Sequence, residues 1–545
     1  MSKKHTIKLI ILLIICSVIS ACTFGKTGDE VDGLIVNDNH TSALNLAVES
    51  IDTLNPLFTN SESVRDCLGL IYEPLYTFDA SLNPIGVLAQ SITTSDCYNY
   101  TIKIKDNVVW HNSDTLDSYD VLHSINLIRY NQSPYSDLLK NIGAAYAPDN
   151  TTITITLTRP VPNIEALLSF PIVPDGVTSE ISTSFIPVGT GPYKYDDKIS
   201  SDKIRLIKNE NWHQSLPSIN EVLLNILKDK EAVINAFDAS EIDAVTSTLI
   251  DLKTNTPRGN IYTNDYTSNN MTFLGINNSS SVLSGSNTKK AISYLIDKND
   301  IVKTEIFQRG QVANIPINPS AWYCTKISDT TYDDAYISEM LALDGWTKNA
   351  SGLFTRDKND ADDPNNSQNT ITQQLKLDIT INENNEERLR IATKIADKLN
   401  AYGIETSVTV LGFEEYKTKI NEKNYSLFIG EITTTANSDP YSMLCKQDNY
   451  FAYSSDRMND VVYRLGFTKT SSEVIACYTE FASIFQEEMP FIPLFFRTES
   501  VIFEKSVSGT SMPNIFSAYP NIANWYFSSA KPSETALSQT PDAAQ

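Results

Sequence analysis

A strand–helix–strand pattern between residues 375 and 411 constrains the fold of this chain more than any other segment. Leu375 to Ile381 alternates as a strand does, and Glu386 to Tyr402 places apolar or small side chains at helical spacing, with Gly403 positioned to end the helix. Thr406 to Leu411 is again strand-like. Because two strands joined through a helix usually pair in parallel, the sequence predicts an α/β protein.

Further patterns predict elements on both sides of that unit. Ser63 to Leu75 has apolar residues at helical spacing, and Asp117 is placed to cap a helix. Thr151 to Thr158 alternates strictly, as an antiparallel strand does, and a long helix is expected from Ser472 to Met489. Pro490 to Phe496 follows, and its two prolines predict an edge strand, because proline donates no hydrogen bond to a neighbouring strand.

The N-terminal residues 1–21 have the features of a secretory signal peptide. Three lysines precede an apolar run from Leu9 to Ile19, which is too short to span a bilayer. The run ends in small residues before Cys22, and this ending resembles a bacterial lipobox, in which the cysteine receives a diacylglyceryl group and becomes the first mature residue. Ordinary secretion, with Cys22 incidental, is the alternative.

The stretches at the two ends of the remaining chain lack a periodic apolar pattern. Residues 22–42 are rich in Gly, Asp, Asn and Thr and are expected to form a flexible tether. Residues 531–545 contain Ser, Thr, Pro and Ala and are expected to be a disordered tail. The about 490 residues between them are enough for two or three hydrophobic cores.

Charge and cysteine usage exclude some classes of protein. The formal net charge is −23, and it becomes −26 once the three signal-peptide lysines are lost, which disfavours a nucleic-acid partner. Five cysteines remain after Cys16 and Cys22, and no pair has C-x-x-C spacing, so neither a zinc ribbon nor a redox dithiol is indicated. Buried free thiols are the favoured interpretation, with one or two disulfides as the alternative.

Nine short segments occur in one order along almost the whole mature chain. They are Leu54-Asn55-Pro56-Leu57, Tyr72-Glu73-Pro74-Leu75, Tyr100 to Asp120, Gly189-Thr190-Gly191-Pro192-Tyr193, Phe237 to Asp243, Phe273 to Asn277, Thr288 to Ile301, Met340 to Trp346 and Glu488 to Phe496. In this order they resemble extracellular solute-binding protein family 5, which serves oligopeptide, dipeptide and nickel importers.

The resemblance implies a two-lobed clamp of the type II periplasmic-binding-protein class with an additional β-rich subdomain in its first lobe. The first lobe is expected to combine residues 43–75, 186–270 and 500–530, with residues 76–185 as the inserted subdomain and 271–499 as the second lobe. A ligand is expected between the lobes, where its contacts with both would stabilise a closed state that an importer recognises.

The implied function is that of a monomeric receptor for an ABC importer, lipid-anchored to the outer face of the cell membrane. It would deliver an oligopeptide-like solute to a permease and ATPase complex. A surface sensor, signalling or adhesion lipoprotein of the same fold is the alternative, as is a receptor for an oligosaccharide or a metal chelate.

Catalytic and metal motifs are weak in this sequence. Neither Gly-x-Ser-x-Gly nor His-Glu-x-x-His occurs. Ser-x-x-Lys occurs at Ser200 and Ser286, but the Lys-Thr-Gly triplet of penicillin-binding proteins matches at residues 26–28, ahead of both serines, so the order of the motifs is wrong for that chemistry. His111 and His123 fall in a turn and a predicted helix, where structural roles are expected. We therefore expect no enzymatic activity, no resident metal, and no cofactor beyond the lipid on Cys22.

One run carries the candidate ligand-binding carboxylates. In peptide-binding relatives an aspartate that follows a Gly-Trp pair binds the ligand's α-amino group; here the run is Gly430 to Pro440, with Glu431 in place of the tryptophan. The aspartate falls on Thr434 or Ala436. Glu431 and Asp439 are the nearest carboxylates, so each is a candidate partner for a cationic group. A strand-end surface role for Glu431 and a turn role for Asp439 are the alternatives.

Four further residues complete the candidate site. Trp322, Tyr323 and Tyr441 fall near predicted loops and are candidates for lining an aromatic pocket. Asn55 stands in the first loop, where the family's first lobe approaches its ligand. Core packing for the aromatic residues and a turn for Asn55 are the alternatives.

Overall fold

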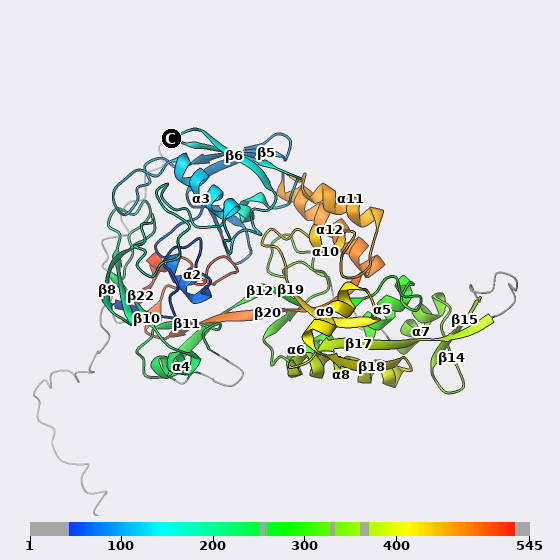
Figure 1. Ribbon diagram of the computed structural model, residues 1–545. Helices are drawn as coiled ribbons and strands as arrows, with labels where there is room; N and C mark the ends of the chain where they lie inside the picture. Colours follow the sequence, from blue (N-terminus) through cyan, green and yellow to red (C-terminus); the bar gives the residue numbers. More distant parts are fainter. Residues whose placement is uncertain (1–42, 251–256, 258, 328–332, 360–369, 529–545) are drawn as a thin grey trace, which may run out of the picture. The chain divides into compact units, whose positions relative to one another are not determined.

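The computed structural model describes residues 43–250, 257, 259–327, 333–359 and 370–528 (Figure 1). Cys22, the predicted signal peptide and tether, and the predicted tail lie outside these residues. Within the described part, none of the helices combines the length and the hydropathy that crossing a bilayer requires. The lobe boundaries expected from the resemblance stay a prediction.

An eleven-stranded sheet joins strands that lie far apart in the sequence. Its order is β18-β17-β19-β12-β20-β11-β1-β10-β9-β8, and β13 pairs with β20 outside this path. The bounds are β1 Ala43–Val48, β8 Tyr193–Ser200, β9 Lys203–Lys208, β10 Glu221–Ile226, β11 Ala244–Thr246, β12 Ile261–Ile276, β13 Gly310–Val312, β17 Lys376–Asn382, β18 Glu405–Leu411, β19 Leu427–Thr433 and β20 Phe491–Glu504.

The predicted strand–helix–strand unit is confirmed. β17 and β18 pair in parallel through their full lengths, and helix α8 (Glu386–Tyr402) connects them. Asn385 caps the helix by accepting a hydrogen bond from the Arg388 backbone N–H at 3.0 Å. Gly403 ends it with φ at 102°, a left-handed conformation that an L side chain adopts only with strain.

The prediction of an edge strand at Pro490–Phe496 holds for residues 491–494 and fails from residue 495 on. The pairing of β20 with β12 extends from Glu504 opposite Ile261 to Phe491 opposite Gly275 (Figure 1). On its other side β20 pairs with β13 at residues 495–497 and with β11 at residues 501–503, so among the described strands residues 491–494 pair with β12 alone. The prolines are tolerated because Pro490 precedes the strand and Pro493 lies at a register shift, where the pairing skips one residue of β20.

The region between residues 76 and 185 contains a separate antiparallel sheet. Its order is β4 (Ala89–Thr94), β5 (Asn99–Ile104), β7 (Thr152–Leu157) and β6 (Ile142–Asp149), and helix α3 (Ser118–Tyr130) contacts β6 and β7. The antiparallel strand predicted at Thr151–Thr158 is therefore confirmed. The Asp117 cap is confirmed as well, because its carboxylate accepts from the backbone N–H groups of Tyr119 and Asp120.

Two sequence motifs bind each other in this region. His111 accepts a hydrogen bond at Nδ1 from the Gly189 backbone N–H (3.2 Å), and its Nε2 lies 3.1 Å from the Gly191 carbonyl oxygen. A Cβ atom on Gly189 would lie 1.8 Å from the carbonyl oxygen of Ile71, so no larger residue fits there. The Trp-His turn and the Gly-Thr-Gly loop thus fix one another.

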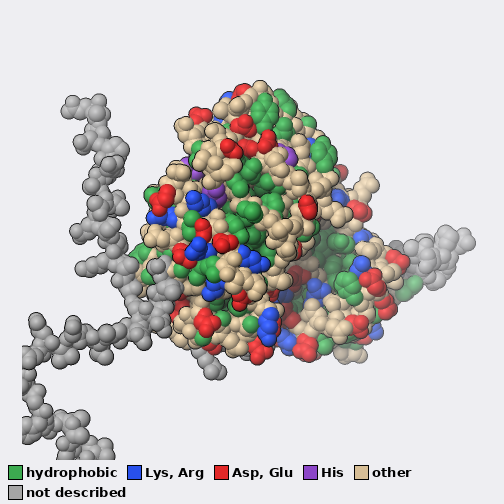
Figure 2. All heavy atoms as spheres, turned by 60° about the vertical axis from the view of Figure 1, so that its left-hand side comes forward, with side chains coloured by type: hydrophobic (Ala, Val, Ile, Leu, Met, Phe, Trp, Pro, Cys, Tyr) green, Lys and Arg blue, Asp and Glu red, His purple; other side chains and the backbone are tan. Residues whose placement is uncertain are grey.

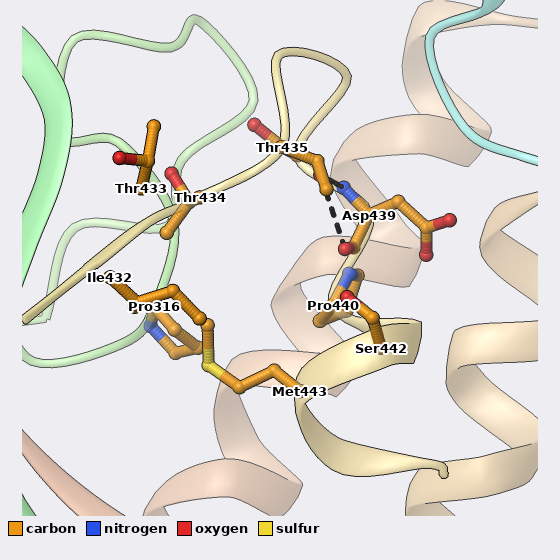
Figure 3. Close-up of a pocket in the computed structure, with 10 residues that line it drawn as sticks. Pro316, Ile432, Thr433, Thr434, Thr435, Asp439, Pro440, Ser442 and Met443 are labelled. Atoms are coloured by element: carbon orange, nitrogen blue, oxygen red, sulfur yellow. Dashed lines mark hydrogen bonds between the residues drawn. The ribbon is translucent and has the colours of Figure 1, made fainter. Parts of the chain in front are cut away.

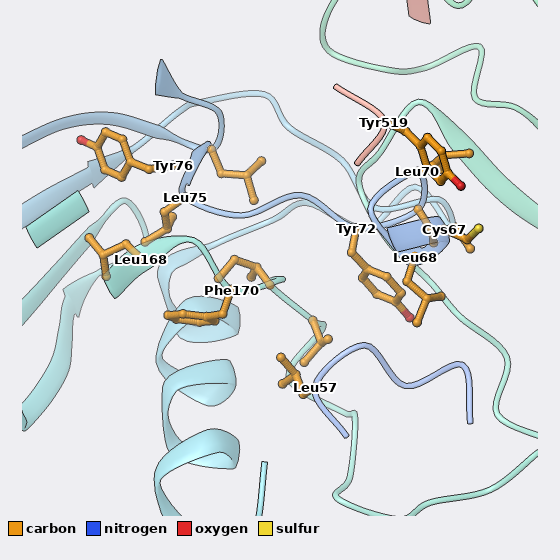
Figure 4. Close-up of a cluster of buried hydrophobic side chains, with 14 of the residues drawn as sticks. Leu57, Cys67, Leu68, Leu70, Tyr72, Leu75, Tyr76, Leu168, Phe170 and Tyr519 are labelled. Atoms are coloured by element: carbon orange, nitrogen blue, oxygen red, sulfur yellow. The ribbon is translucent and has the colours of Figure 1, made fainter. Parts of the chain in front are cut away.

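The helix predicted at Ser63–Leu75 is too long, because α2 ends at Leu68 (Glu62–Leu68). After the helix, Leu70 and Ile71 accept hydrogen bonds from the loop that contains Gly191, and a continued helix would use these carbonyl groups itself. The apolar spacing instead reflects a shared core, in which side chains from Leu57 to Tyr76 pack with Leu168, Phe170 and Tyr519 (Figure 4).

Two further buried clusters fill the region between residues 271 and 496. One surrounds α8 and β17, and the other surrounds α12 with an aromatic group formed by Phe273, Phe428, Phe451 and Phe491. The remaining elements are α4 Lys230–Asp238, α5 Ser286–Leu295, α6 Lys298–Thr304, α7 Asp334–Leu343, α9 Phe413–Asn421, α10 Tyr441–Leu444, α11 Asp456–Leu465, α12 Ser471–Glu488, β2 Tyr76–Phe78, β3 Pro84–Gly86, β14 Thr347–Lys348, β15 Phe354–Asn359, β16 Thr370–Gln374, β21 Val507–Ser508, β22 Tyr526–Phe527 and the short 3-10 helices η1 Ile164–Leu168 and η2 Ile522–Asn524.

Candidate ligand-binding site

A small hollow, with about 20 Å³ of space accessible to water, lies where β19 ends and α10 begins (Figure 3). Hydroxyl-bearing and apolar side chains supply most of its lining, together with Asp439. The lining residues are Pro316, Ile432, Thr433, Thr434, Thr435, Ser438, Asp439, Pro440, Ser442 and Met443. Sequence analysis had singled out the run Gly430 to Pro440, which supplies most of this wall.

Hydrogen bonds to a bulge in β12 hold the start of the wall. The Thr434 backbone N–H donates to the Asn269 carbonyl at 2.8 Å, and Thr433 Oγ1 donates to Asn270 Oδ1 at 2.7 Å. The buried Asn318 side chain donates to carbonyl groups of the same bulge. The loop after β19 therefore starts from a fixed position.

A buried polar network holds the far side of the loop. The Tyr323 hydroxyl donates to Ser438 Oγ at 2.9 Å, and the Tyr478 hydroxyl donates to the Ser438 carbonyl at 3.0 Å. The Tyr323 and Tyr478 rings are stacked with centroids 4.6 Å apart. Burial raises the pKa of Tyr323 above its ordinary value, so its hydroxyl keeps its proton at neutral pH.

Asp439 is nearly buried and binds a cation supplied by the chain itself. Its side chain is 4% exposed, and Oδ2 accepts a charge-assisted hydrogen bond from Arg159. Oδ1 accepts from the Tyr441 backbone N–H at 3.1 Å. The Arg159 guanidinium also lies over the Tyr441 ring, 4.2 Å from its centroid.

Glu431 also pairs with an arginine of the chain. Its Oε2 accepts from Arg497 Nε (3.0 Å) and Nη2 (2.6 Å), and Arg497 Nη2 also donates to Glu387 Oε1 at 2.6 Å. Although burial opposes the charge of Arg497, its bonds to the two carboxylates hold the arginine pKa above its ordinary value. Ligand binding by Glu431 and Asp439 stays a prediction, and in this structure both carboxylates already bind cations.

Three of the other four predicted residues lie beside the same loop, and Asn55 lies elsewhere. Tyr323 and Tyr441 lie next to the loop at Ser438 and Asp439, and Trp322 packs edge-on against Tyr323 with centroids 5.3 Å apart. Asn55 is fully buried elsewhere, where its side chain donates to the Thr178 carbonyl and accepts from the Leu57 N–H. The structure thus groups four predicted residues around one loop, with Glu431 on the strand that precedes it.

Sequence reasoning missed Arg159 and Asn163, which approach the loop from the segment between β7 and η1. Asn163 Nδ2 donates to the Asn437 carbonyl and Asn437 Nδ2 donates to the Pro162 carbonyl, both at 3.0 Å. A separation of more than 270 positions leaves no local pattern that could have revealed this contact.

A group of carboxyls around α2 was missed as well. Burial raises the pKa of Asp66 to about 8, and repulsion from Glu62 and Glu499 adds to the shift. Glu499 accepts a hydrogen bond from the Tyr266 hydroxyl at 2.7 Å, which links β20 to β12 at this point.

Metal-binding and cysteine chemistry are not indicated by the described residues. Among them, no group of three or more His, Cys, Asp or Glu side chains is arranged to hold a metal ion. The five cysteines within the described ranges carry free thiols, and three of them are buried, Cys67, Cys97 and Cys477, whereas Cys324 and Cys445 are half-buried. The interpretation as buried free thiols is therefore confirmed for three of the five. Acidic and basic side chains are interspersed on the face shown in Figure 2, so the net negative charge is not gathered into one area there.

Solved structures share this fold. The murein-tripeptide-binding protein MppA, in an unliganded open form, superimposes with a TM-score of 0.75 at 16% identity, covering 90% of this chain and 98% of MppA. NikZ from Campylobacter jejuni, in complex with Ni(L-His), gives a TM-score of 0.61 at 21% identity over 89% of this chain and 99% of NikZ. The fold is that of a two-lobed type II periplasmic binding protein, as expected.

Sequence comparison identifies the family within this class. The sequence model for bacterial extracellular solute-binding proteins, family 5, matches residues 83–452, and the chain therefore belongs to that family. The oligopeptide-binding protein AppA of Bacillus subtilis is 21% identical over 556 aligned positions, which cover 96% of this chain and 99% of AppA. Family members are binding proteins, and the resemblance inferred from nine short segments is confirmed.

Proposed function

We propose that this chain is the substrate-binding receptor of an ABC importer and that it captures an oligopeptide-like solute. The observation that carries the proposal is the match to family 5 across residues 83–452, together with the end-to-end correspondence with an oligopeptide-binding protein. The receptor releases its solute unchanged to a permease and ATPase complex.

The chemistry of the hollow supports a peptide-like solute. Five of its lining side chains carry hydroxyl groups. Those of Thr433, Thr434 and Thr435 donate their protons within the protein, so their oxygens are left as acceptors for the N–H groups of an amide backbone. Pro316, Ile432 and Met443 offer apolar contact for a side chain of the solute. Neutral groups of this kind accept many sequences, because they impose no charge requirement on the solute.

A metal chelate is the second candidate, because NikZ binds nickel as a histidine complex. The described residues hold no cluster that could ligate a bare ion, so such a metal would arrive with its own ligands. A sensor or adhesion role has no comparable support from the relatives.

The receptor is further proposed to be a monomer that a lipid on Cys22 anchors to the outer face of the membrane. The support is the sequence alone: a signal-like segment followed by small residues and a cysteine. In cells fed labelled palmitate, the wild-type chain should carry label and sediment with membranes. Cys22→Ser should do neither, and a labelled, membrane-bound serine variant would contradict the anchor.

Native mass spectrometry of the protein purified gently from its own host tests the solute class. The expected result is a ladder of masses that correspond to bound peptides. Thr434→Tyr, which would fill the hollow, should lose that ladder, whereas Thr93→Tyr on the exposed strand β4 should keep it. A nickel-dependent adduct, a sugar mass, or persistent emptiness would contradict the peptide assignment.

A further inference from the structure

Asp439 and Tyr441 together form a subsite with the chemistry to bind an organic cation, called the cation subsite below. Asp439 offers a nearly buried carboxylate, and Tyr441 offers the face of an aromatic ring that is 37% exposed. An ammonium or guanidinium group placed between them would gain both an ion pair and a cation–π contact. Sequence analysis predicted Asp439 as a partner for a cationic group and Tyr441 as a lining residue of an aromatic pocket.

The cation subsite is held in place by hydrogen bonds that do not involve its cation. Thr435 Oγ1 accepts from the Asp439 backbone N–H (2.8 Å) and donates to the Asp439 carbonyl (3.2 Å) (Figure 3). The Tyr441 backbone N–H donates to Asp439 Oδ1. These bonds set the carboxylate and the ring relative to each other through the backbone of one short loop. We therefore expect the cation subsite to keep its geometry when its cation is removed.

Arg159 occupies the cation subsite. One guanidinium nitrogen bonds the carboxylate, another donates to the Pro160 carbonyl at 3.2 Å, and the guanidinium carbon lies 4.2 Å from the centroid of the Tyr441 ring. The reciprocal amide bonds between Asn163, Asn437 and Pro162 hold the segment that carries the arginine against the same loop. The guanidinium is thus delivered by a fixed part of the fold.

We propose that Arg159 is a specificity-determining residue. It is an internal cation that occupies the cation subsite formed by Asp439 and Tyr441, and it thereby prevents a solute from binding there through its own amine. This inference rests on the proposed function of the neighbouring hollow. In Figure 3 the carboxylate of Asp439 points away from Thr433 and Thr434, so the solute is left with the hydroxyl-lined wall. The class of solute is a peptide whose α-amino group is not required for recognition.

Displacement of Arg159 by a solute is unfavourable for a physical reason. If a free amine bound the Asp439 carboxylate, the Arg159 side chain, only 26% exposed, would be left without its counter-ion. The displaced Arg159 guanidinium would also lose its contact with the Tyr441 ring. The internal partner also has an entropic advantage, because it is covalently attached and already oriented.

The direct test uses guanidinium chloride as the probe, at millimolar concentrations below those that denature proteins. In Arg159→Gly the vacated cation subsite should bind guanidinium saturably. This binding should appear as a rise in melting temperature that sodium chloride at equal ionic strength does not produce. The wild type should show no saturable rise, and Arg159→Gly combined with Asp439→Asn should lose it.

Arg205→Gly is the matched control. Arg205 also pairs with a single carboxylate, that of Asp196, but both side chains are substantially exposed, at 40% and 30%. No saturable rescue is expected there. If Arg159→Gly does not fold, the titration is made on Arg159→Gln, which keeps the stem and removes the charge. A folded variant without saturable binding, or equal rescue of Arg205→Gly, would overturn the proposal.

A second arm tests specificity in the wild type. Matched peptides with a free or an acetylated N-terminus should bind with affinities within about twofold, because no amine is read at Asp439. A preference of about tenfold or more for the free amine would overturn the inference. If no peptide binds at all, the proposed function fails, whereas the guanidinium titration still reports on Arg159.

Discussion

The carboxylate of Glu73 lies 2.9 Å from the Nε2 atom of His213, although 140 positions separate the two residues in the sequence. Glu73 is buried and also accepts hydrogen bonds from the side chains of Thr190, Trp212 and Gln214. One carboxylate in the Tyr-Glu-Pro-Leu motif therefore joins three segments of the first half of the chain.

Glu73→Ala should destabilise the protein by about 3 kcal/mol, because it leaves several donors in the interior without an acceptor. Denaturant unfolding measures the loss. The control is Glu210→Ala, whose side chain is 67% exposed beside Lys208 and should change stability by less than about 0.5 kcal/mol. Equal effects of the two substitutions would contradict the role assigned to Glu73.

His111 should make the protein less stable as the pH falls below neutrality. Burial lowers the pKa of His111 from 6.5 to about 4, and its Nδ1 must stay unprotonated to accept the Gly189 N–H. Between these values the unfolded chain takes up a proton that the folded chain does not, so stability is lost as the pH drops from 6.5 to 4. The loss should be about 3 kcal/mol. Melting temperatures of the wild type and His111→Gln across this range check it, and parallel curves would speak against it.

Asp66 should act in the opposite direction. Its pKa in the folded state, about 8, lies above the ordinary value of 3.8, so the unfolded chain releases its proton first and stability falls as the pH rises through this window. Asp66→Asn should therefore raise the melting temperature, and the gain should grow between pH 4 and 8. Asp149→Asn is the control of opposite sign, because bonds from Thr152 and Thr151 lower the pKa of Asp149 to about 2. A gain for Asp66→Asn that does not vary with pH would contradict the assignment.

Gly403 should tolerate alanine poorly for two separable reasons. Its φ of 102° strains any L side chain, and a Cβ atom would lie 2.3 Å from the Gly352 carbonyl oxygen. Gly259 has φ of 118° with nothing within 4 Å of its Cβ position, so Gly259→Ala carries the strain alone. Gly403→Ala should cost about 1–3 kcal/mol more in the free energy of unfolding than Gly259→Ala. Equal costs would show that the close contact relaxes freely.

Local patterns predicted the fold where local forces determine it. α8 and the α3 cap follow from apolar spacing and a capping side chain within one segment. The central position of β20 from residue 495 on could not be predicted, because its neighbours β12 and β11 come from distant parts of the chain and a register shift accommodates Pro493. The end of α2 was missed because the carbonyl groups of Leu70 and Ile71, just after the helix, bond a loop more than 100 positions away.

The candidate site divides in the same way. The family motif located the loop after β19, where Asp439, Tyr441 and Tyr323 meet. The pairing of Asp439 and Glu431 with arginines of the chain could not be predicted, because Arg159 and Arg497 lie 280 and 66 positions away and belong to no motif. Ion pairing across such separations depends on the assembled fold.

The most direct test of the central claim is calorimetric titration of the purified protein with a pool of short peptides of mixed sequence, beside the hollow-filling variant Thr434→Tyr. The account predicts saturable binding to the wild type that the variant loses while its melting temperature stays unchanged. Saturable binding that survives in Thr434→Tyr would place the solute elsewhere, and the absence of binding to the wild type would contradict the assignment as a peptide receptor.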